Sequence, residues 1–212
     1  MSISNESRGR IKAIFEPIAL AMGRAGLTPN ALTLIGFAIT TVGAVLVGLQ
    51  LWVIGGIVVF LGGVFDMFDG TLARATGQAS PLGAFMDSVF DKLGEIIVFL
   101  GVIAGLLAVG AADVPILVAA AAMGAAIMVS YARAKSDGLG YSSGMGLAAV
   151  GVMPREVRLV IISIGIVLTG TTLGTSAIEF ALGVILVGSV ITVIQRILFV
   201  RSQARSGTPS NQ

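Results

Sequence analysis

Four aspartates stand close together between two of the most apolar stretches of the chain. Residues 66 to 92 read DMFDGTLARATGQASPLGAFMDSVFDK and contain Asp66, Asp69, Asp87 and Asp91. The first pair is spaced i, i+3 and the second i, i+4, so each pair projects from one face of a helix. Carboxylates in an apolar setting are costly unless cations or a polar cavity accompany them. The spacing therefore predicts two neighbouring helices that bring both pairs to one cation-binding site.

The available residue types limit the chemistry of this site. The chain has no histidine and no cysteine, so a metal must be held by oxygen atoms, which suits Mg²⁺ or Mn²⁺ better than zinc. Two such ions about 3.5–4 Å apart would clamp a phosphoryl or pyrophosphoryl group for in-line displacement. Arg74, one turn beyond Asp69, would hold further phosphate charge. A structural ion-pair network is the alternative, but one arginine does not neutralise four aspartates.

The composition places these aspartates in a membrane protein. Of the 212 residues, 56% are hydrophobic and only 11% are charged, whereas an ordinary soluble domain has roughly 25% charged residues. The mean hydropathy is +1.00. We therefore expect an all-α integral membrane protein whose surface faces membrane lipid, and nothing in the chain indicates a nucleic-acid partner.

The apolar runs predict six transmembrane helices. Residues 31–65 carry no charge, and as one helix they would measure about 52 Å, too long for a hydrocarbon core about 30 Å thick. We expect two spans that turn near residues 48–50, with Trp52 as an interfacial anchor. Four further spans are predicted at residues 81–108, 114–136, 156–173 and 177–200.

The charge distribution predicts the orientation of these spans. The turns near residues 50, 110 and 175 would share one side, which carries Asp113 and Glu179 but no lysine or arginine. All 13 lysines and arginines fall at or near the other side, with both chain ends. By the positive-inside rule we expect that side, with the aspartate site, to face the cytoplasm from the cell inner membrane.

The flanks of the six-span domain are amphipathic or polar. Residues 1–26 alternate apolar and charged positions with helical period, which predicts an interfacial amphipathic helix, a disordered start being the alternative. The six-helix domain would cover residues 27–202, and residues 203–212 form a flexible tail. The glycine-rich segment 138–151 is either a lid over a substrate or a plain connection.

The aspartate stretch resembles the signature of the CDP-alcohol phosphatidyltransferases. The matching residues are Asp66, Asp69, Gly70, Ala73, Arg74, Gly83, Asp87 and Asp91. The resemblance implies that an acceptor hydroxyl attacks the β-phosphate of a CDP-linked lipid and releases CMP, with two Mg²⁺ ions, or Mn²⁺, as cofactors. It also implies a homodimer.

The roles that the resemblance implies can be assigned residue by residue. Asp66, Asp69 and Asp87 are metal ligands, and Asp91 is the general base, which also touches metal. The implied CDP-lipid contacts are Asn30, Thr33, Gly70, Arg74 and Ser80. The lipid is either CDP-diacylglycerol or CDP-archaeol, because the residues that would face its tails are generic aliphatic ones.

A second group of charges indicates an anionic acceptor. Cations at cytoplasmic helix ends are also what topology requires, but five from three helices exceed that need. They are Arg133, Lys135, Arg155, Arg158 and Arg196. The pattern SYARAK, with arginines at the start of the next span, is similar to the inositol-phosphate branch of the family, apart from an exchange of Arg and Lys. This implies that the five residues hold the phosphate of an inositol phosphate, and glycerol 3-phosphate, as used in phosphatidylglycerophosphate synthesis, is the alternative.

Two other classes of membrane protein use intramembrane aspartates. A membrane cation transporter is one alternative, but a conduction path needs polar groups at several depths, and nearly all charges here lie at one predicted surface. An aspartate-rich prenyltransferase is the other, and it normally carries DDxxD pairs that this chain lacks. The sequence therefore favours phosphatidyl transfer.

Overall fold

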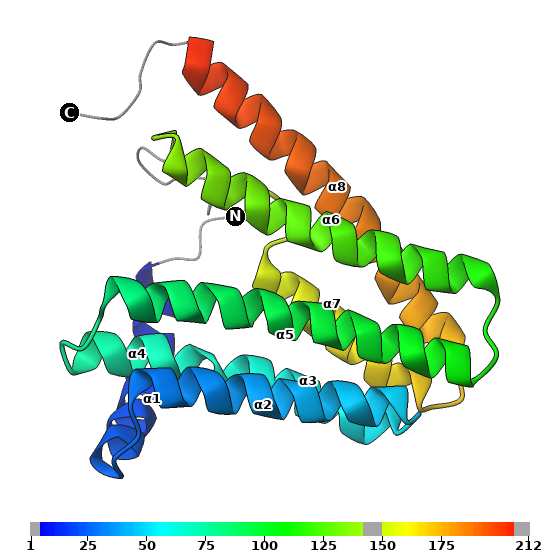
Figure 1. Ribbon diagram of the computed structural model, residues 1–212, viewed down its shortest axis with the longest axis horizontal. Coiled ribbons are helices and arrows are strands. Elements are labelled where there is room, and N and C mark those ends of the chain that lie inside the picture. Colours follow the sequence, from blue (N-terminus) through cyan, green and yellow to red (C-terminus); the bar gives the residue numbers. More distant parts are fainter. Residues whose placement is uncertain (1–4, 142–149, 206–212) are drawn as a thin grey trace.

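The computed structural model describes residues 5–141 and 150–205, and these form an all-helical bundle (Figure 1). Most of the segment predicted as lid or connection (142–149) and of the predicted tail (206–212) lies outside the described residues. In chain order the helices are α1 (Asn5–Arg24), α2 (Pro29–Gly48), α3 (Trp52–Phe65), α4 (Met67–Ala75), α5 (Pro81–Ala108), α6 (Asp113–Gly138), α7 (Arg155–Thr169) and α8 (Thr175–Arg205).

The predicted turns between the long helices are present. The chain reverses between α2 and α3 at Gln50, whose φ of 64° lies in the left-handed region. The turns after α2, α5 and α7 lie at one end of the bundle, opposite the connection between α4 and α5 and the C-terminal end of α8 (Figure 1). This arrangement gathers the cationic helix ends at the other end of the bundle, as the charge pattern predicted.

Two details differ from the sequence prediction. Trp52 is buried, with 8% of its surface exposed, and its ring would meet a side chain at Gly105. The expectation that Trp52 is an interfacial anchor was therefore wrong: the ring fills the gap that Gly105 leaves between helices. The helix of the first aspartate pair is also interrupted at Asp66, which ends α3 and precedes the separate helix α4.

Four segments are long and apolar enough to cross a membrane. They are Pro29–Gly48, Trp52–Ala75, Asp113–Gly138 and Thr175–Arg205. The predicted spans at residues 81–108 (α5) and 156–173 (α7) are not among these four described segments. Helix α5 carries three acidic side chains and a lysine between residues 87 and 95, and α7 has only 15 residues, which is about 22 Å of helix. The multi-pass membrane architecture is confirmed, while the count of six spans stays a prediction.

Small residues let the central helices approach closely. A Cβ atom at Gly43 of α2 would lie 2.7 Å from the backbone nitrogen of Val59 in α3. A Cβ at Gly101 of α5 would lie 2.3 Å from the carbonyl oxygen of Ala44 in α2. Larger residues at these positions would keep the helix backbones apart. Close packing of backbones across small residues is a usual basis of helix association in lipid. Helices α3 and α5 are thereby held on either side of α2, at a fixed depth relative to each other.

A smaller apolar cluster holds helix α4, which follows Asp66 and carries Asp69, in place. Ala19 of α1, Leu32 of α2, and Phe68 and Leu72 of α4 are buried together. The rings of Phe15 and Phe68 add a contact with centroids 5.1 Å apart. The predicted N-terminal helix is therefore present as α1, and it braces the short helix that carries Asp69.

The close approach of α2 and α5 predicts a sharp asymmetry between two glycines. Gly101→Ala should lower the Tm of the detergent-solubilised protein, because the new Cβ meets a backbone oxygen that cannot move alone, an overpacking cost of about 1–3 kcal/mol. Gly124→Ala in α6 is the matched control, since a Cβ there meets nothing within 4 Å of the described residues. A Tm for Gly101→Ala equal to or above that of Gly124→Ala would contradict this packing.

Candidate functional site

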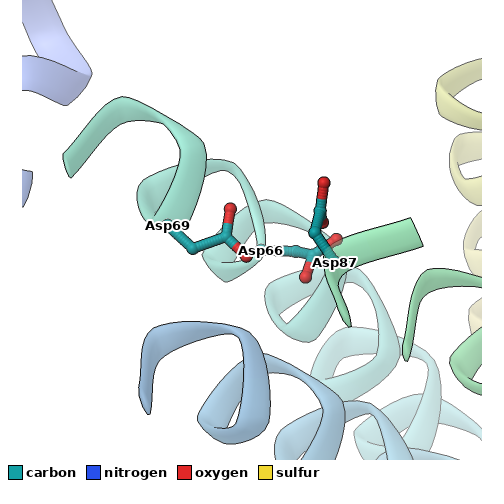
Figure 2. Close-up of side chains that lie close together, drawn as sticks. All are labelled: Asp66, Asp69 and Asp87. Atoms are coloured by element: carbon teal, nitrogen blue, oxygen red, sulfur yellow. The ribbon is translucent and has the colours of Figure 1, made fainter. Parts of the chain in front are cut away.

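Three of the four predicted aspartates meet at the end of the bundle where α3 passes into α4, opposite the turns after α2, α5 and α7. Carboxylate oxygens of Asp66, Asp69 and Asp87 all lie within 4.8 Å of one another (Figure 2). Asp66 stands at the junction of α3 and α4, Asp69 lies in the first turn of α4, and Asp87 lies on α5. The i, i+3 spacing and the neighbouring second helix thus converge as the sequence predicted.

Asp69 is the most firmly held of the three. It is buried, with 5% of its surface exposed. The Thr33 hydroxyl on α2 donates a hydrogen bond of 2.5 Å to one of its carboxylate oxygens, and the Gly70 backbone N–H donates to the other. Thr33 was predicted to contact the nucleotide, and that contact stays a prediction; in the structure its hydroxyl orients the Asp69 carboxylate. Two fixed hydrogen bonds leave the remaining lone pairs of Asp69 for a ligand.

Asp91 lies outside this close trio and faces an arginine. The Arg155 guanidinium at the start of α7 lies with Nη1 2.7 Å from Asp91 Oδ1 and 2.9 Å from Asp66 Oδ2. One cation therefore bridges the two aspartate pairs. Asp91 is mostly buried, with 17% of its side chain exposed. The Asp91 carboxylate also lies within side-chain hydrogen-bonding reach of Asp66, and Arg155, which contacts both, can itself bind phosphate.

The donor set suits hard divalent cations. Three carboxylates at this spacing offer only oxygen atoms, the ligands that Mg²⁺ and Mn²⁺ prefer. Buried carboxylates are stable only when they are paired with a cation or coordinate a metal. The short contacts of Arg155 with Asp66 and Asp91 are such a pairing. Asp66, Asp69 and Asp87 therefore fit a metal centre.

Two hollows meet at the aspartates. An open cleft of about 990 Å³ is lined by all four of them, together with Arg74, Arg155 and Phe15 of α1. A second cavity of about 160 Å³ shares Asp69, Gly70 and Asp87 with it. The five residues predicted to contact the CDP-lipid all line this second cavity: Asn30, Thr33, Gly70, Arg74 and Ser80. A ligand in the second cavity would reach the aspartates directly.

Glycines and a helix cap shape the wall of this second cavity. Ser80 caps α5, its hydroxyl accepting a hydrogen bond of 3.0 Å from the Gly83 N–H. A Cβ at Gly83 would lie 3.1 Å from the Ser80 hydroxyl and 3.4 Å from Asn30 Oδ1. A Cβ at Gly70 would lie 3.1 Å from Arg74 Nη1. Side chains at these two positions would fill space that a ligand needs.

The five predicted acceptor-binding cations do not share one environment. Arg155 contacts the aspartates, whereas Arg158 is buried and bonds to Glu95 and to the Met153 carbonyl. Arg196 of α8 is also buried, and it donates hydrogen bonds to the backbone carbonyls of residues 129 and 150. The other two stand exposed near the end of α6, where Arg133 lies 3.8 Å from Asp137 and Lys135 is exposed. Of these five cations, Arg155 and Arg158 are the two that line the described cavities around the aspartates.

Glu95 is a residue of this region that the sequence analysis missed. Its carboxylate accepts a hydrogen bond of 2.6 Å from Arg158 Nε and lies 3.4 Å from Lys92 Nζ. Glu95 stands four residues after Asp91, so both acids lie on one face of α5. That i, i+4 spacing was the available signal, because it extends the aspartate face by one turn.

Comparisons with known proteins agree on one family. Residues 26–200 match the family model of the CDP-alcohol phosphatidyltransferases. An archaetidylinositol phosphate synthase of Pyrococcus horikoshii is 32% identical over 200 residues, 94% of this chain and 97% of that protein. A phosphatidylinositol phosphate synthase of Mycolicibacterium smegmatis is 34% identical over 210 residues, 96% of this chain and 90% of that protein.

Solved structures give the same result for the fold. The crystal structure of Mycobacterium tuberculosis phosphatidylinositol phosphate synthase with CDP-DAG bound has a TM-score of 0.77 at 27% identity, covering 89% of this chain and 94% of that chain. The same enzyme in complex with manganese and citrate has a TM-score of 0.78 at 28% identity, covering 89% of each chain.

The bridging position of Arg155 predicts competition with metal. Arg155→Gln should tighten Mn²⁺ binding, because it removes a cation that contacts Asp66 and Asp91 and that would share these carboxylates with the ion. We expect a fall in Kd of about fivefold or more, the lower end of usual coupling between sites. Titration calorimetry of the purified protein measures this directly.

Two variants serve as references for that titration. Arg133→Gln removes an exposed arginine that contacts Asp137, so its Mn²⁺ affinity should equal that of the wild type. Asp66→Asn should act in the opposite direction and weaken Mn²⁺ binding, because a charged ligand is lost. An Arg155→Gln affinity at or below the wild-type value would show that the arginine supports the metal instead of competing with it.

Proposed function

The chain belongs to the CDP-alcohol phosphatidyltransferase family, and we propose that it transfers the phosphatidyl or archaetidyl group of a CDP-linked lipid to a hydroxyl of an inositol phosphate. The acceptor oxygen forms a bond to the β-phosphorus, the bond from that phosphorus to CMP breaks, and CMP leaves. The observation that carries this proposal is the trio Asp66, Asp69 and Asp87 at the junction of two cavities.

The smaller cavity is the proposed nucleotide site. Its wall combines the family motif residues Gly70 and Arg74 with Asn30, Thr33 and Ser80. Arg74 is exposed toward this hollow and pairs with phosphate charge, while the two glycines Gly70 and Gly83 let the nucleotide approach the backbone. The lipid tails, of diacylglycerol or archaeol, lie along the apolar flank of the bundle.

The aspartate trio is the proposed site of two Mg²⁺ ions, for which Mn²⁺ can substitute. Metal ions held there would supply stabilisation of the negative charge on the transferred phosphoryl group and on the leaving oxygen. Thr33 and the Gly70 N–H hold the Asp69 carboxylate in place. Asp91, from the adjacent turn of α5, would serve as a further ligand.

Asp91 is the proposed general base. It lies on the α5 face that leads from Asp87 toward the arginines of α7, so it faces the side from which an anionic acceptor would come. Its carboxylate takes the proton of the attacking hydroxyl. Arg155 lies 2.7 Å from it and orients it. The same arginine is one of the groups proposed to hold the acceptor's phosphate.

The acceptor is proposed from charge and from relatives. Arg133, Lys135, Arg155, Arg158 and Arg196 are the proposed ligands of its phosphate. Relatives of about 30% identity over nearly the full chain are phosphatidylinositol phosphate or archaetidylinositol phosphate synthases. Glycerol 3-phosphate is the second candidate, because it presents the same phosphate dianion to these cations. The transporter alternative is set aside, since the chain belongs to a family of transferases.

The cellular arrangement follows the charge distribution. We propose six spans in the cell inner membrane, with the active site and both chain ends on the cytoplasmic side, where the lysines and arginines gather. A homodimer is the proposed assembly. We place residues 1–26 on the membrane surface and assign residues 27–202 to the transferase domain; of the predicted tail (203–212), residues 203–205 instead belong to the end of α8.

The acceptor assignment is tested by CMP release from CDP-diacylglycerol in the presence of Mg²⁺. We expect release with inositol 1-phosphate and little or none with free inositol, glycerol 3-phosphate or serine, because only a phosphate-bearing acceptor of the right size pairs with the arginines. Release with glycerol 3-phosphate instead would keep the chemistry and replace the acceptor. No release with any of the four calls for CDP-archaeol as donor, and failure with both donors would refute the proposed function.

The role of Asp91 is tested by Asp91→Asn. Turnover should fall by roughly 10²–10⁴-fold, the usual contribution of a general base, while the calorimetric affinity for CDP-diacylglycerol stays close to that of the wild type. Asp113→Asn, an exposed change at the start of α6 at the opposite end of the bundle, should leave turnover unchanged. An Asp91→Asn enzyme that keeps more than about a tenth of its turnover would exclude Asp91 as the base.

A further inference from the structure

Two ion pairs, one helical turn apart, connect α7 to α5 beside the aspartate trio. Arg155 contacts Asp91, and Arg158 contacts Glu95 with Nε 2.6 Å from Oε1. The arginines are spaced i, i+3 on α7 and the acids i, i+4 on α5, so each pair of side chains lies on one helix face. The Arg155–Asp91 pair includes the proposed base. The Arg158–Glu95 pair has no role in the chemistry described so far.

The Glu95–Arg158 pair lines a cavity beneath the aspartates. This hollow of about 50 Å³ lies between α2, α3, α5 and α7. Asp66, Glu95, Arg155 and Arg158 contribute its polar wall, and side chains such as Val98 and Ile162 its apolar wall. The Glu95–Arg158 pair therefore stands where the polar site meets the apolar interior, and it is largely shielded from water.

Of the three guanidinium nitrogens of Arg158, two donate hydrogen bonds to described residues and the third does not. Nε donates to Glu95, and Nη1 donates to the Met153 carbonyl at 2.8 Å. Nη2 is buried and has no hydrogen-bond partner among the described residues, although the side chain is only 2% exposed. A buried charged group rarely leaves a donor unpaired. An anionic oxygen beside Nη2 would supply the missing acceptor.

Glu95 orients the guanidinium of Arg158 and therefore sets the direction of Nη2. Its carboxylate lies between Arg158 and Lys92, at 2.6 Å and 3.4 Å, so its own negative charge is compensated from two sides. With Nε and Nη1 both engaged, the planar guanidinium has one orientation, and Nη2 is the remaining donor. A neutral or shorter side chain at position 95 would let the plane rotate.

We infer that Glu95 is a positioning residue for the acceptor: it orients Arg158 so that Nη2 binds the phosphate monoester of the anionic substrate. The inference rests on the proposed function, because it assigns Arg158 to the acceptor's phosphate. Glu95 itself touches no reacting atom. It acts only through Arg158, one helical turn from Arg155 and the base.

This role predicts a selective loss of acceptor binding. In Glu95→Gln, which keeps the length and one acceptor oxygen, the KM for inositol 1-phosphate should rise by about tenfold, a modest share of a charged hydrogen bond. In Glu95→Ala the rise should be larger. The kcat and the KM for CDP-diacylglycerol should stay within about twofold of wild type, and Glu95→Asp should restore part of the loss. These readouts separate positioning from a general structural role, which would lower kcat and disturb both substrates.

The matched control is Glu156→Gln, which removes an exposed acid from the first turn of α7, two residues before Arg158. It should behave as the wild type, with both KM values unchanged. If Glu95→Ala does not fold, the Gln and Asp variants decide the question. Equal effects of Glu95→Gln and Glu156→Gln, or a fall in kcat with both KM values shifted, would overturn the inference.

A binding measurement separates this inference from the function on which it rests. Inositol 1-phosphate and, separately, inorganic phosphate are titrated into the purified protein with Mg²⁺ and no CDP-lipid. Weaker binding of both in Glu95→Gln than in Glu156→Gln supports the positioning role, even if the wild type releases no CMP and the proposed reaction fails. Wild-type CMP release together with equal phosphate affinities in the two variants would retain the function and refute the role of Glu95.

Discussion

Repulsion among carboxylates inside an apolar bundle is the constraint on which the rest of the structure depends. Three aspartate carboxylates lie within 4.8 Å of one another, and a fourth stands one turn away. Such a group persists only if positive charge and hydrogen-bond donors surround it. The chain supplies Arg155 from α7, the Thr33 hydroxyl from α2 and the Gly70 N–H from α4. The site is consequently open at one end of the bundle, where cations and phosphates can enter.

Close helix packing converts two local sequence patterns into that one site. The i, i+3 and i, i+4 spacings place each aspartate pair on a face, but the faces meet only if α2, α3 and α5 lie at the correct depth. Glycines make this possible: Gly43 and Gly101 admit neighbouring backbones, and a Cβ at Gly36 would lie 3.4 Å from the Asp66 nitrogen. In lipid, where no hydrophobic effect drives helices together, such contacts carry much of the association. Packing and chemistry therefore depend on the same small residues.

The arginines show how one requirement of topology serves several purposes. The positive-inside rule by itself predicts that positive charge gathers at the helix ends on one side of a membrane protein. In this chain Arg155 faces aspartates, Arg158 faces a glutamate and a backbone carbonyl, and Arg196 donates to two backbone carbonyls. The buried guanidiniums fix α7 and α8 relative to the catalytic end. Affinity for an anionic substrate and rigidity of its binding site thus draw on the same group of side chains.

The sequence by itself determined the elements and the class of chemistry. Uncharged runs of known length predicted the long helices and their turns, and the absence of histidine and cysteine left only oxygen ligands for a metal. Helical periodicity also placed each aspartate pair on one face of its helix. The tertiary structure decided which partners meet: Arg158 with Glu95, 63 residues away, Arg155 with both Asp66 and Asp91, and Trp52 with the gap at Gly105. Periodicity assigns a side chain to a face of its own helix, but long-range pairing depends on how two packed helices are rotated and offset. That information lies in the fit of many side chains at once, so no local pattern contains it.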